Sequence, residues 1–225
     1  MSALPAPEAV PTPSSGRAPA RPVRRRMAPD ERREDIVQTA RGVFARQGLS
    51  QTGVRDIAAA AGVSVGTVTY HFTGIAEILA EVITLETSEV YAGDVVATSR
   101  QAENGRAQLE SYADLLLSGT RRMREHWWLW FDFWTLSARE PRYARWRAEH
   151  YKQWRDEVAS AFRRGAEDGS LPRAALPGTD VAAAVSSFIA LVDGLVVQAY
   201  LPLGTITPKR AREILREHVA AAAGG

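Results

Sequence analysis

The segment Ala61–Phe72, with the sequence AGVSVGTVTYHF, constrains the fold of this chain more than any other stretch. Ala58 lies just before it, Gly62 is a natural turn residue, and Val68 follows at helical spacing. A small residue lets two helices cross closely, glycine tolerates a left-handed turn, and an apolar residue on the second helix locks it against the first. Many helix pairs share this spacing, but with its flanking residues it predicts a helix-turn-helix.

Helical periodicity also dominates the rest of the chain. Apolar residues from Ile36 to Phe44 recur on one helical face, and Gly48 is a natural stop. The longest apolar region, Val181–Leu203, is interrupted by polar residues, which favours a buried helix over a membrane span. No strand, repeat or glycine-rich phosphate loop is evident, so we expect an all-α protein. The expected helices cover about 29–47, 53–61, 65–72, 75–99, 105–124, 125–139, 141–168, 180–201 and 207–223.

Residues 1–28 differ from everything that follows. They contain six prolines, five arginines and one acid, which gives them a net charge of +4, so the remainder carries −2 of the total of +2. Such a composition without hydrophobic periodicity predicts disorder. The segment RPVRRR at its end is either a solvated tail or a basic arm that contacts an acidic partner.

The longer string TGVRDIAAAAGVSVGTVTYHF, Thr52–Phe72, resembles the DNA-binding domain of TetR-family transcriptional regulators. The resemblance extends through IVQTARGVFARQGLS before it and IAEILAEVITL after it. It implies a cytoplasmic, nucleoid-associated homodimer that binds a double-stranded DNA operator and a small-molecule effector, most often as a repressor that releases DNA when the effector binds. The implied domains are a disordered basic arm (1–28), a helix-turn-helix DNA-binding domain (29–74) and an effector-binding and dimerisation domain (75–225).

The third helix is expected to enter the major groove, which is wide enough to admit it. Thr52 and Ser64 are also expected to cap the second and third helices. Two positions depart from the family pattern: Thr69 replaces a common tyrosine and Ile75 a common lysine, and both losses remove contacts to the DNA backbone. The candidate DNA-binding residues of this domain are Thr52, Ser64, Val65, Gly66, Thr67, Thr69, Tyr70 and His71.

The charge of the helix-turn-helix points to the N-terminal arm. Residues 29–74 contain five arginines and five acids, so this domain is neutral. Phosphate binding normally supplies much of the affinity for DNA through basic side chains. We therefore expect Arg24, Arg25 and Arg26 to contact DNA, as the arms of other helix-turn-helix proteins do in the minor groove.

The helix expected at 125–139 contains HWWLWFDFWTLSARE and is apolar nearly all round, which predicts a buried position. Its aromatic residues either pack the core or line an effector pocket. This region is somewhat similar to the choline-responsive repressors of the family, and aromatic cages bind quaternary ammonium ions. Asp132 or Glu149 could add charge, yet a flat hydrophobic drug, lipid or polyketide would suit the same side chains. The candidate effector-binding residues are Tyr91, Trp127, Trp130, Phe131, Trp134, Tyr151, Trp154 and Phe188.

The last two helices are expected to form a four-helix dimer interface with their symmetry mates. Two-fold symmetry then requires a roughly palindromic operator. The candidate interface residues are Val185, Ile189, Val192, Gly194, Leu195, Val196 and Ala199.

Other functional classes have little support in the sequence. The chain has four histidines, no cysteine and no nucleophile elbow, so we expect neither an enzyme nor a metal or cofactor site. Two alternatives remain open: an activator of the same fold, and a helical protein-interaction module without specific DNA binding. A mobility-shift assay on the protein's own promoter region separates the module from the regulator.

Overall fold

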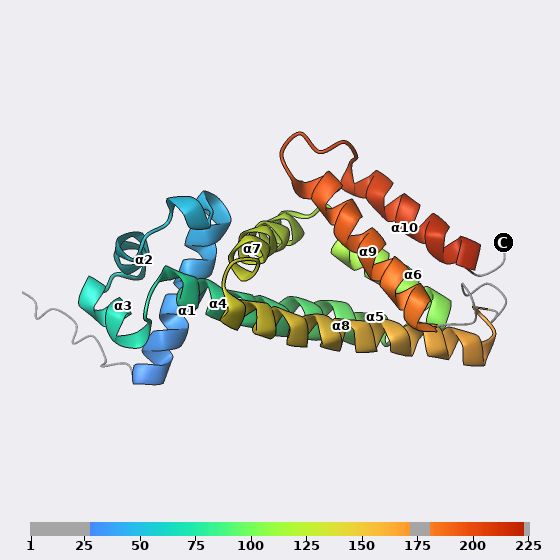
Figure 1. Cartoon of the computed structure of the whole chain (residues 1–225), viewed down its shortest axis with the longest axis horizontal. Helices are drawn as coiled ribbons and strands as arrows, with labels where there is room; N and C mark the ends of the chain where they lie inside the picture. The colour runs from blue at the N-terminus through green and yellow to red at the C-terminus, as the bar shows by residue number, and fades with distance from the viewer. Residues whose placement is uncertain (1–27, 172–180, 223–225) are drawn as a thin grey trace, which may run out of the picture.

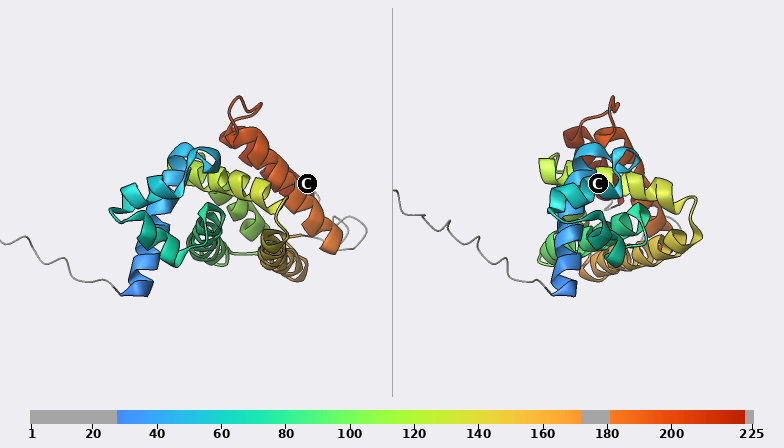
Figure 2. Two further views of the ribbon diagram at one scale, coloured as in Figure 1. Left: turned by 60° about the vertical axis from the view of Figure 1, so that its left-hand side comes forward. Right: turned by 90° about the vertical axis from the view of Figure 1, so that its left-hand side faces the viewer.

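A computed structural model describes residues 28–171 and 181–222, and within these ranges every regular element is helical and no strand occurs. The chain is therefore all-α, as predicted. The N-terminal helices stand at one end of the molecule and the last two helices at the other (Figures 1 and 2). The main helices are α1 (Pro29–Gln47), α2 (Val54–Ala61), α3 (Val65–His71), α4 (Ile75–Glu86), α6 (Gly105–Leu116), α7 (Arg121–Ser137), α8 (Pro141–Asp168), α9 (Val181–Tyr200) and α10 (Pro208–Ala222).

The helix-turn-helix forms where the sequence places it. Gly62 adopts φ 65° and ψ 34°, and its backbone N–H donates to the carbonyls of Ala58 and Ala59, which closes α2. Ser64 caps α3 by accepting a hydrogen bond from the N–H of Thr67 at 3.0 Å. Val68 is fully buried against the preceding helices. The left-handed glycine, the cap and the apolar lock are thus all used as predicted.

Thr52 does not cap α2, contrary to expectation. The N-cap is Gly53, whose N–H donates to Asp56 Oδ2 at 2.8 Å. The Thr52 hydroxyl instead donates back to the Gly48 carbonyl at 2.7 Å, and its side chain is buried. Thr52 therefore braces the turn after α1 and does not present its side chain to a DNA surface.

The expected long helix at 75–99 is confirmed, but its middle is unusual. After Glu86 the helix continues without a break into a π-helical segment, Thr87–Val96, and then into the short α5, Ala97–Ser99. π-helical turns are rare, usually span a single turn, and occur frequently at functional sites. Ten consecutive residues in this form therefore mark the segment as special.

The boundary between α6 and α7 differs from the expected one. We expected the earlier helix to run to about Arg124, but it ends at Leu116. Gly119 then adopts φ 72°, and Thr120 caps α7 by accepting from the N–H of Met123 at 3.2 Å. A left-handed glycine followed by a capping threonine outweighs the continuous apolar period of this region.

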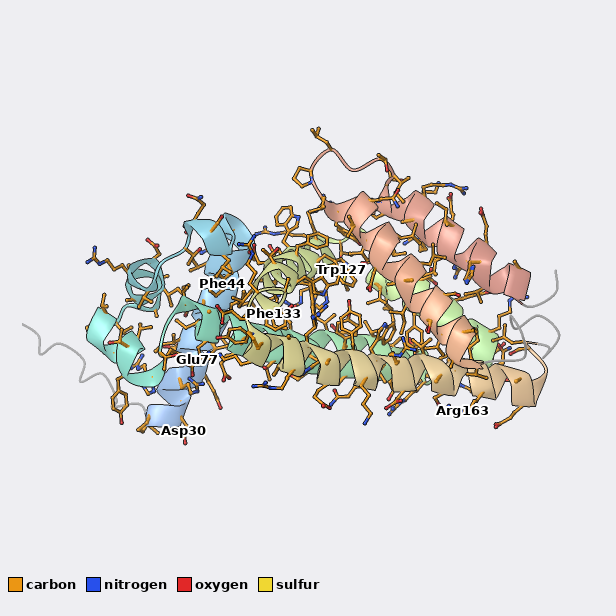
Figure 3. All side chains as sticks on the ribbon, viewed as in Figure 1. Asp30, Phe44, Glu77, Trp127, Phe133 and Arg163 are labelled. Atoms are coloured by element: carbon orange, nitrogen blue, oxygen red, sulfur yellow. The ribbon has the colours of Figure 1, made fainter. Side chains whose placement is uncertain are left out.

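Nearly all buried apolar residues of the described chain form one continuous core. Helix α7 lies in this core between the N-terminal helices and the C-terminal helices. α7 packs on α1 and α4 on one side and on α8 and α9 on the other. In Figure 3, Phe44 of α1 and Phe133 of α7 mark the contact between the N-terminal helices and the rest, and both side chains are buried. By length and composition α9 alone would pass as a membrane-spanning helix, with a mean hydropathy of 1.9, but its apolar face packs in this core.

The dimer-interface prediction needs correction for most of its residues. Gly194 and Ala199 are partly exposed on α9. The others point into the protomer's own core, because the inward face of α9 packs on α8 and α10. A side chain buried within one protomer cannot form the surface that meets a second copy. The residues excluded on this ground are Val185, Ile189, Val192, Leu195 and Val196.

We expect Gly105→Ala to destabilise the protein strongly. A Cβ at Gly105 would lie 2.1 Å from the backbone N of Gly165, where α6 and α8 cross, and backbone cannot move aside as a flexible side chain can. Overpacking of this kind costs roughly 1–3 kcal/mol, and we expect the upper part of that range in urea denaturation. Gly93→Ala is the control, because its Cβ would meet its nearest neighbour at an ordinary 3.5 Å. Equal stability of the two variants would contradict the crossing.

Candidate functional site

The outer face of α3 is the first candidate site. Val65, Gly66, Thr69 and Tyr70 are exposed on it, and the ring of Tyr70 is 78% exposed. Most of the surface of these side chains is therefore not needed for packing within the chain, although the Tyr70 ring meets the His71 ring edge-on. These residues form the part of the predicted recognition face that is free to meet a partner, and α3 itself lies at the end of the molecule (Figure 1).

The hydroxyl groups of α3 are partly committed to the helix itself. The Ser64 and Thr67 hydroxyls lie 2.9 Å apart and share a hydrogen bond. The Thr69 hydroxyl donates to the carbonyl of Val65 at 3.2 Å and is also near that of Gly66. Each hydroxyl oxygen keeps lone pairs that can accept a further bond. The remaining candidate, His71, is half-buried at the end of the helix with its ring edge-on to Tyr70.

Arg33 of α1 holds the C-terminal end of α3 in place, a role that the sequence analysis missed. Its guanidinium donates to the carbonyl of His71 at 3.0 Å and lies over the ring of Phe72 at 4.2 Å. It also pairs with Glu81 of α4 at 2.8 Å. One planar cation thus ties α1, α3 and α4 together and fixes the orientation of the recognition helix.

Most of the arginines of this domain are neutralised within it. Arg32 pairs with Asp35, Arg33 with two glutamates of α4, and Arg41 with Glu86. Arg46 and Arg55 are exposed and make no ion pair with the described residues. The predicted arm residues Arg24, Arg25 and Arg26 lie outside the described residues.

An aromatic cavity of about 210 Å³ lies between the π-helical segment, α7, α8 and α9. The rings of Tyr91 and Trp130 meet edge to face with centroids 6.1 Å apart, and Tyr91 and Trp154 lie 5.6 Å apart. Five of the predicted effector residues therefore come together from three separate elements. These lining residues are Tyr91, Trp130, Trp134, Tyr151 and Trp154.

Asp193 of α9 supplies a carboxylate to this cavity. It accepts a hydrogen bond from the Tyr151 hydroxyl at 3.1 Å. Burial raises the pKa of the Asp193 carboxyl to about 6, although the Tyr151 hydrogen bond acts in the opposite direction. A second carboxylate, Glu157, lines the cavity but pairs with Arg100. Asp193 is therefore the acidic group of the cavity that has no basic partner among the described residues.

Three predicted effector residues lie elsewhere. Trp127 is buried, and its indole N–H donates to the Leu116 carbonyl at 2.9 Å. Phe188 is buried against Phe162, and Phe131 packs on Trp134 outside the cavity lining. Periodicity places all of them on inward faces, but only the crossing angles of the helices decide which inward residue meets a cavity.

The two acids suggested as charged partners of the effector also lie elsewhere. Asp132 accepts a hydrogen bond from the backbone N–H of Leu49 at 2.7 Å, so it joins α7 to the end of α1. Glu149 is exposed on α8 and does not line the cavity. The signal for Asp193 in the sequence is a single acidic residue within a mostly apolar helix.

Both ends of the chain match known protein families. Residues 105–224 match the model described as BetI-type transcriptional repressor, C-terminal, and residues 36–82 match that of the bacterial regulatory proteins of the tetR family. No curated protein matches the sequence significantly.

Many solved structures share the fold. A protein from Saccharomonospora viridis, assigned as a transcriptional regulator and solved in complex with choline, is 26% identical over 85% of this chain and 96% of its own, with a TM-score of 0.76. One from Pseudomonas aeruginosa PAO1, also assigned as a transcriptional regulator, is 25% identical over 89% and 94%, with a TM-score of 0.70. A TetR-family protein from Rhodococcus sp. shares the fold at 21% identity over 86% and 99%, with a TM-score of 0.71.

The helix-turn-helix, the helical second domain with its aromatic cavity and the two family matches agree with one another. The chain belongs to the TetR family and is a ligand-responsive, DNA-binding transcriptional regulator rather than an enzyme.

Proposed function

We propose that this protein is a homodimeric repressor that releases a palindromic operator when a small organic cation of the choline type binds the aromatic cavity. The observation that carries the proposal is the cavity itself, in which aromatic rings from three elements surround the unpaired carboxylate of Asp193. The regulator would act in the cytoplasm, on the DNA of the nucleoid.

A cation fits this cavity for two physical reasons. The faces of tryptophan and tyrosine rings attract cations electrostatically, most strongly where water is excluded. An ionised Asp193 adds a full negative charge, and its raised pKa means that the empty cavity disfavours this charge. A bound cation compensates for that cost. The choline complex of the Saccharomonospora viridis protein supports the same class of ligand.

DNA binding would divide between two parts of the chain. The exposed face of α3 would read base edges, since methyl and hydroxyl groups can do so without charge. The arm residues Arg24–Arg26 would supply contacts to the phosphates, because most arginines of the helix-turn-helix are already paired. In a homodimer, two copies of α3 about 34–36 Å apart would meet successive major grooves.

Selection of bound duplexes from a random pool tests the DNA half of this proposal and yields the operator. Recovery of a palindrome with half-sites one helical turn apart supports a homodimeric regulator. Recovery of no enriched sequence would leave the interaction-module alternative as the better account. Sedimentation of the free and DNA-bound protein reports the oligomeric state directly.

We expect choline to quench tryptophan fluorescence with an affinity that depends on Asp193. Since the ionised carboxylate binds the cation, affinity should be highest above pH 7 and should fall about tenfold per pH unit below the pKa of about 6. Asp193→Asn should weaken binding at pH 7.5 and flatten this dependence.

Glu149→Gln is the matched control for this measurement, because it removes one negative charge from the exposed face of α8. Its choline affinity should equal that of the wild type. A neutral isostere of choline, 3,3-dimethylbutanol, should bind more weakly to the wild type than choline does. Equal binding of the two would argue against a cation site and favour a purely hydrophobic effector.

Tyr70→Ala should weaken operator binding by roughly 1–3 kcal/mol, as loss of a contact in the groove does. The Tyr70 side chain is exposed and its ring contact is an edge-on one with His71, so the free energy of unfolding should change little. Fluorescence anisotropy with the selected operator measures the effect. Gln47→Ala, at an exposed position of α1, is the control. Unchanged affinity of the Tyr70 variant would exclude this ring from the interface.

Deletion of residues 1–26 should lower operator affinity and flatten its dependence on salt. Each phosphate contact contributes about 0.9 to the slope of log affinity against log salt concentration, so loss of Arg24, Arg25 and Arg26 from both protomers of a dimer should reduce the slope by up to ~5.4. Substitution of only Arg24, Arg25 and Arg26 by glutamine separates their charge from the length of the arm. An unchanged slope would show that the arm does not contact phosphates.

A further inference from the structure

The carboxylate of Glu86, the last residue of α4, is completely buried and is bound from two other helices. Its Oε1 pairs with the guanidinium of Arg41 on α1 and with Arg122 Nη1 on α7 at 2.9 Å. Its Oε2 lies 2.7 Å from His126 Nδ1, also on α7. Both oxygens are therefore used, and one charge joins α1, α4 and α7. These four side chains are called the Glu86 junction below.

The ionisation states in the junction follow from the environment. Burial opposes the charge on Glu86, but the hydrogen bonds from His126 and Arg41 and the charge of Arg41 outweigh it and hold the pKa of Glu86 below the ordinary value. Burial lowers the pKa of His126, so its imidazole is neutral at pH 7. A neutral imidazole that donates to a carboxylate carries its proton on Nδ1. Its other nitrogen, Nε2, is then a buried acceptor without a partner among the described residues.

The junction touches the aromatic cavity directly. The His126 ring lies 5.4 Å from the ring of Tyr91 and 6.3 Å from that of Trp130, centroid to centroid, and both rings line the cavity. Glu86 is also the residue just before the π-helical segment, from which Thr87, Tyr91 and Ala92 reach the same cavity. A displacement of the Tyr91 or Trp130 ring therefore acts directly on the His126 ring of the junction.

On its other side the junction holds the DNA-binding helices. Arg41 lies on α1, and Arg33 of the same helix fixes the end of α3. A second tie runs in parallel, since Asp132 of α7 holds the Leu49 N–H just after α1. Both carboxylate oxygens of Glu86 are paired, and displacement of a buried, paired charge leaves that charge without a partner. The relative orientation of α7 and α1 is therefore fixed by these contacts, and a small shift of α7 disturbs them.

We propose that the Glu86 junction transmits occupancy of the aromatic cavity to the DNA-binding helices, with Glu86 as the residue on which this coupling depends. The proposal rests on the proposed function, because it names how the effector site and the DNA site of that function communicate. A ligand that moves Tyr91 and Trp130 shifts His126 and the start of the π-helical segment. Glu86 follows, and Arg41 carries the shift into α1.

The test is the ratio of operator dissociation constants with and without saturating choline. In the wild type we expect a ratio of roughly 5–150, the usual range for coupled sites. Glu86→Gln should bring the ratio below about 2 while choline still quenches tryptophan fluorescence and the operator is still bound. Asp94→Asn is the control, because Asp94 is exposed on the π-helical segment and makes no ion pair with the described residues. It should keep the wild-type ratio.

Two further variants keep the test decisive. If Glu86→Gln does not fold, Arg41→Gln combined with Glu86→Gln removes both charges together and retains an amide pair between α1 and α4. Ala92→Trp fills the cavity without any ligand and should by itself raise amide hydrogen exchange at the end of α1 and change operator affinity by at least about fivefold. In the Glu86→Gln background it should do neither.

The possible outcomes distinguish an error in the junction proposal from an error in the choice of choline as effector. If choline has no effect but Ala92→Trp changes operator affinity in a manner that depends on Glu86, choline is the wrong effector and the junction stands. If choline acts on the wild type and equally on the Glu86 variants, the proposed function stands and the junction proposal is overturned. If Ala92→Trp has the same effect with and without Glu86, the junction proposal is also overturned.

Discussion

Helix α7 is the constraint on which the rest of this structure depends. A helix that is apolar nearly all round must be enclosed, and here α1 and α4 cover one side while α8 and α9 cover the other. Its tryptophans then necessarily face different neighbours: Trp127 closes the core with a hydrogen bond to α6, whereas Trp130 and Trp134 face the cavity. The same helix places Arg122, His126 and Asp132 against the DNA-binding half. The DNA-binding helices and the cavity thus share one wall.

The basic residues of the DNA-binding domain are used for architecture before they are available for DNA. Arg33 ties three helices together, and Arg41 enters a buried junction. A guanidinium suits both tasks because its planar donors can satisfy several acceptors at fixed angles. Their use inside the protein leaves α3 an uncharged recognition helix with an exposed tyrosine. Arg46 and Arg55 stay exposed and unpaired among the described residues, and the arginine-rich segment directly before α1 is a further source of positive charge in a chain whose net charge is only +2.

The parts of the fold that depend on short-range chemistry could be predicted from the sequence. The turn at Gly62, the Ser64 cap and the burial of Val68 each involve residues only a few positions apart. The local sequence is therefore enough to predict them. The cavity could be predicted only in composition. Periodicity cannot distinguish Trp127 from Trp130, because both point inward and only the packing of distant helices decides which meets empty space. The same limit explains the error in α9, where an apolar face taken for a dimer surface packs inside the protomer. The roles of Arg33 and Glu86 could not be predicted for a related reason, since their partners lie dozens of residues away in the sequence.

Glu86 and Asp193 are both largely buried acids, but only Glu86 has basic partners among the described residues. This difference indicates what each residue does. Glu86 is saturated by cations and hydrogen bonds of the protein itself, so its charge is stable in the unliganded state. Asp193 has a tyrosine hydroxyl but no cation, and a pKa of about 6 places it roughly 2 units above an ordinary carboxyl, a cost of about 3 kcal/mol when it is ionised at neutral pH. A protein gains nothing in stability from such a group. The cost is removed when a cation enters the cavity, so it becomes part of the binding free energy and discriminates against neutral ligands of the same shape. Under the proposed function, the compensated charge of Glu86 keeps the junction in one geometry, and the uncompensated charge of Asp193 favours a cation as the ligand of the cavity.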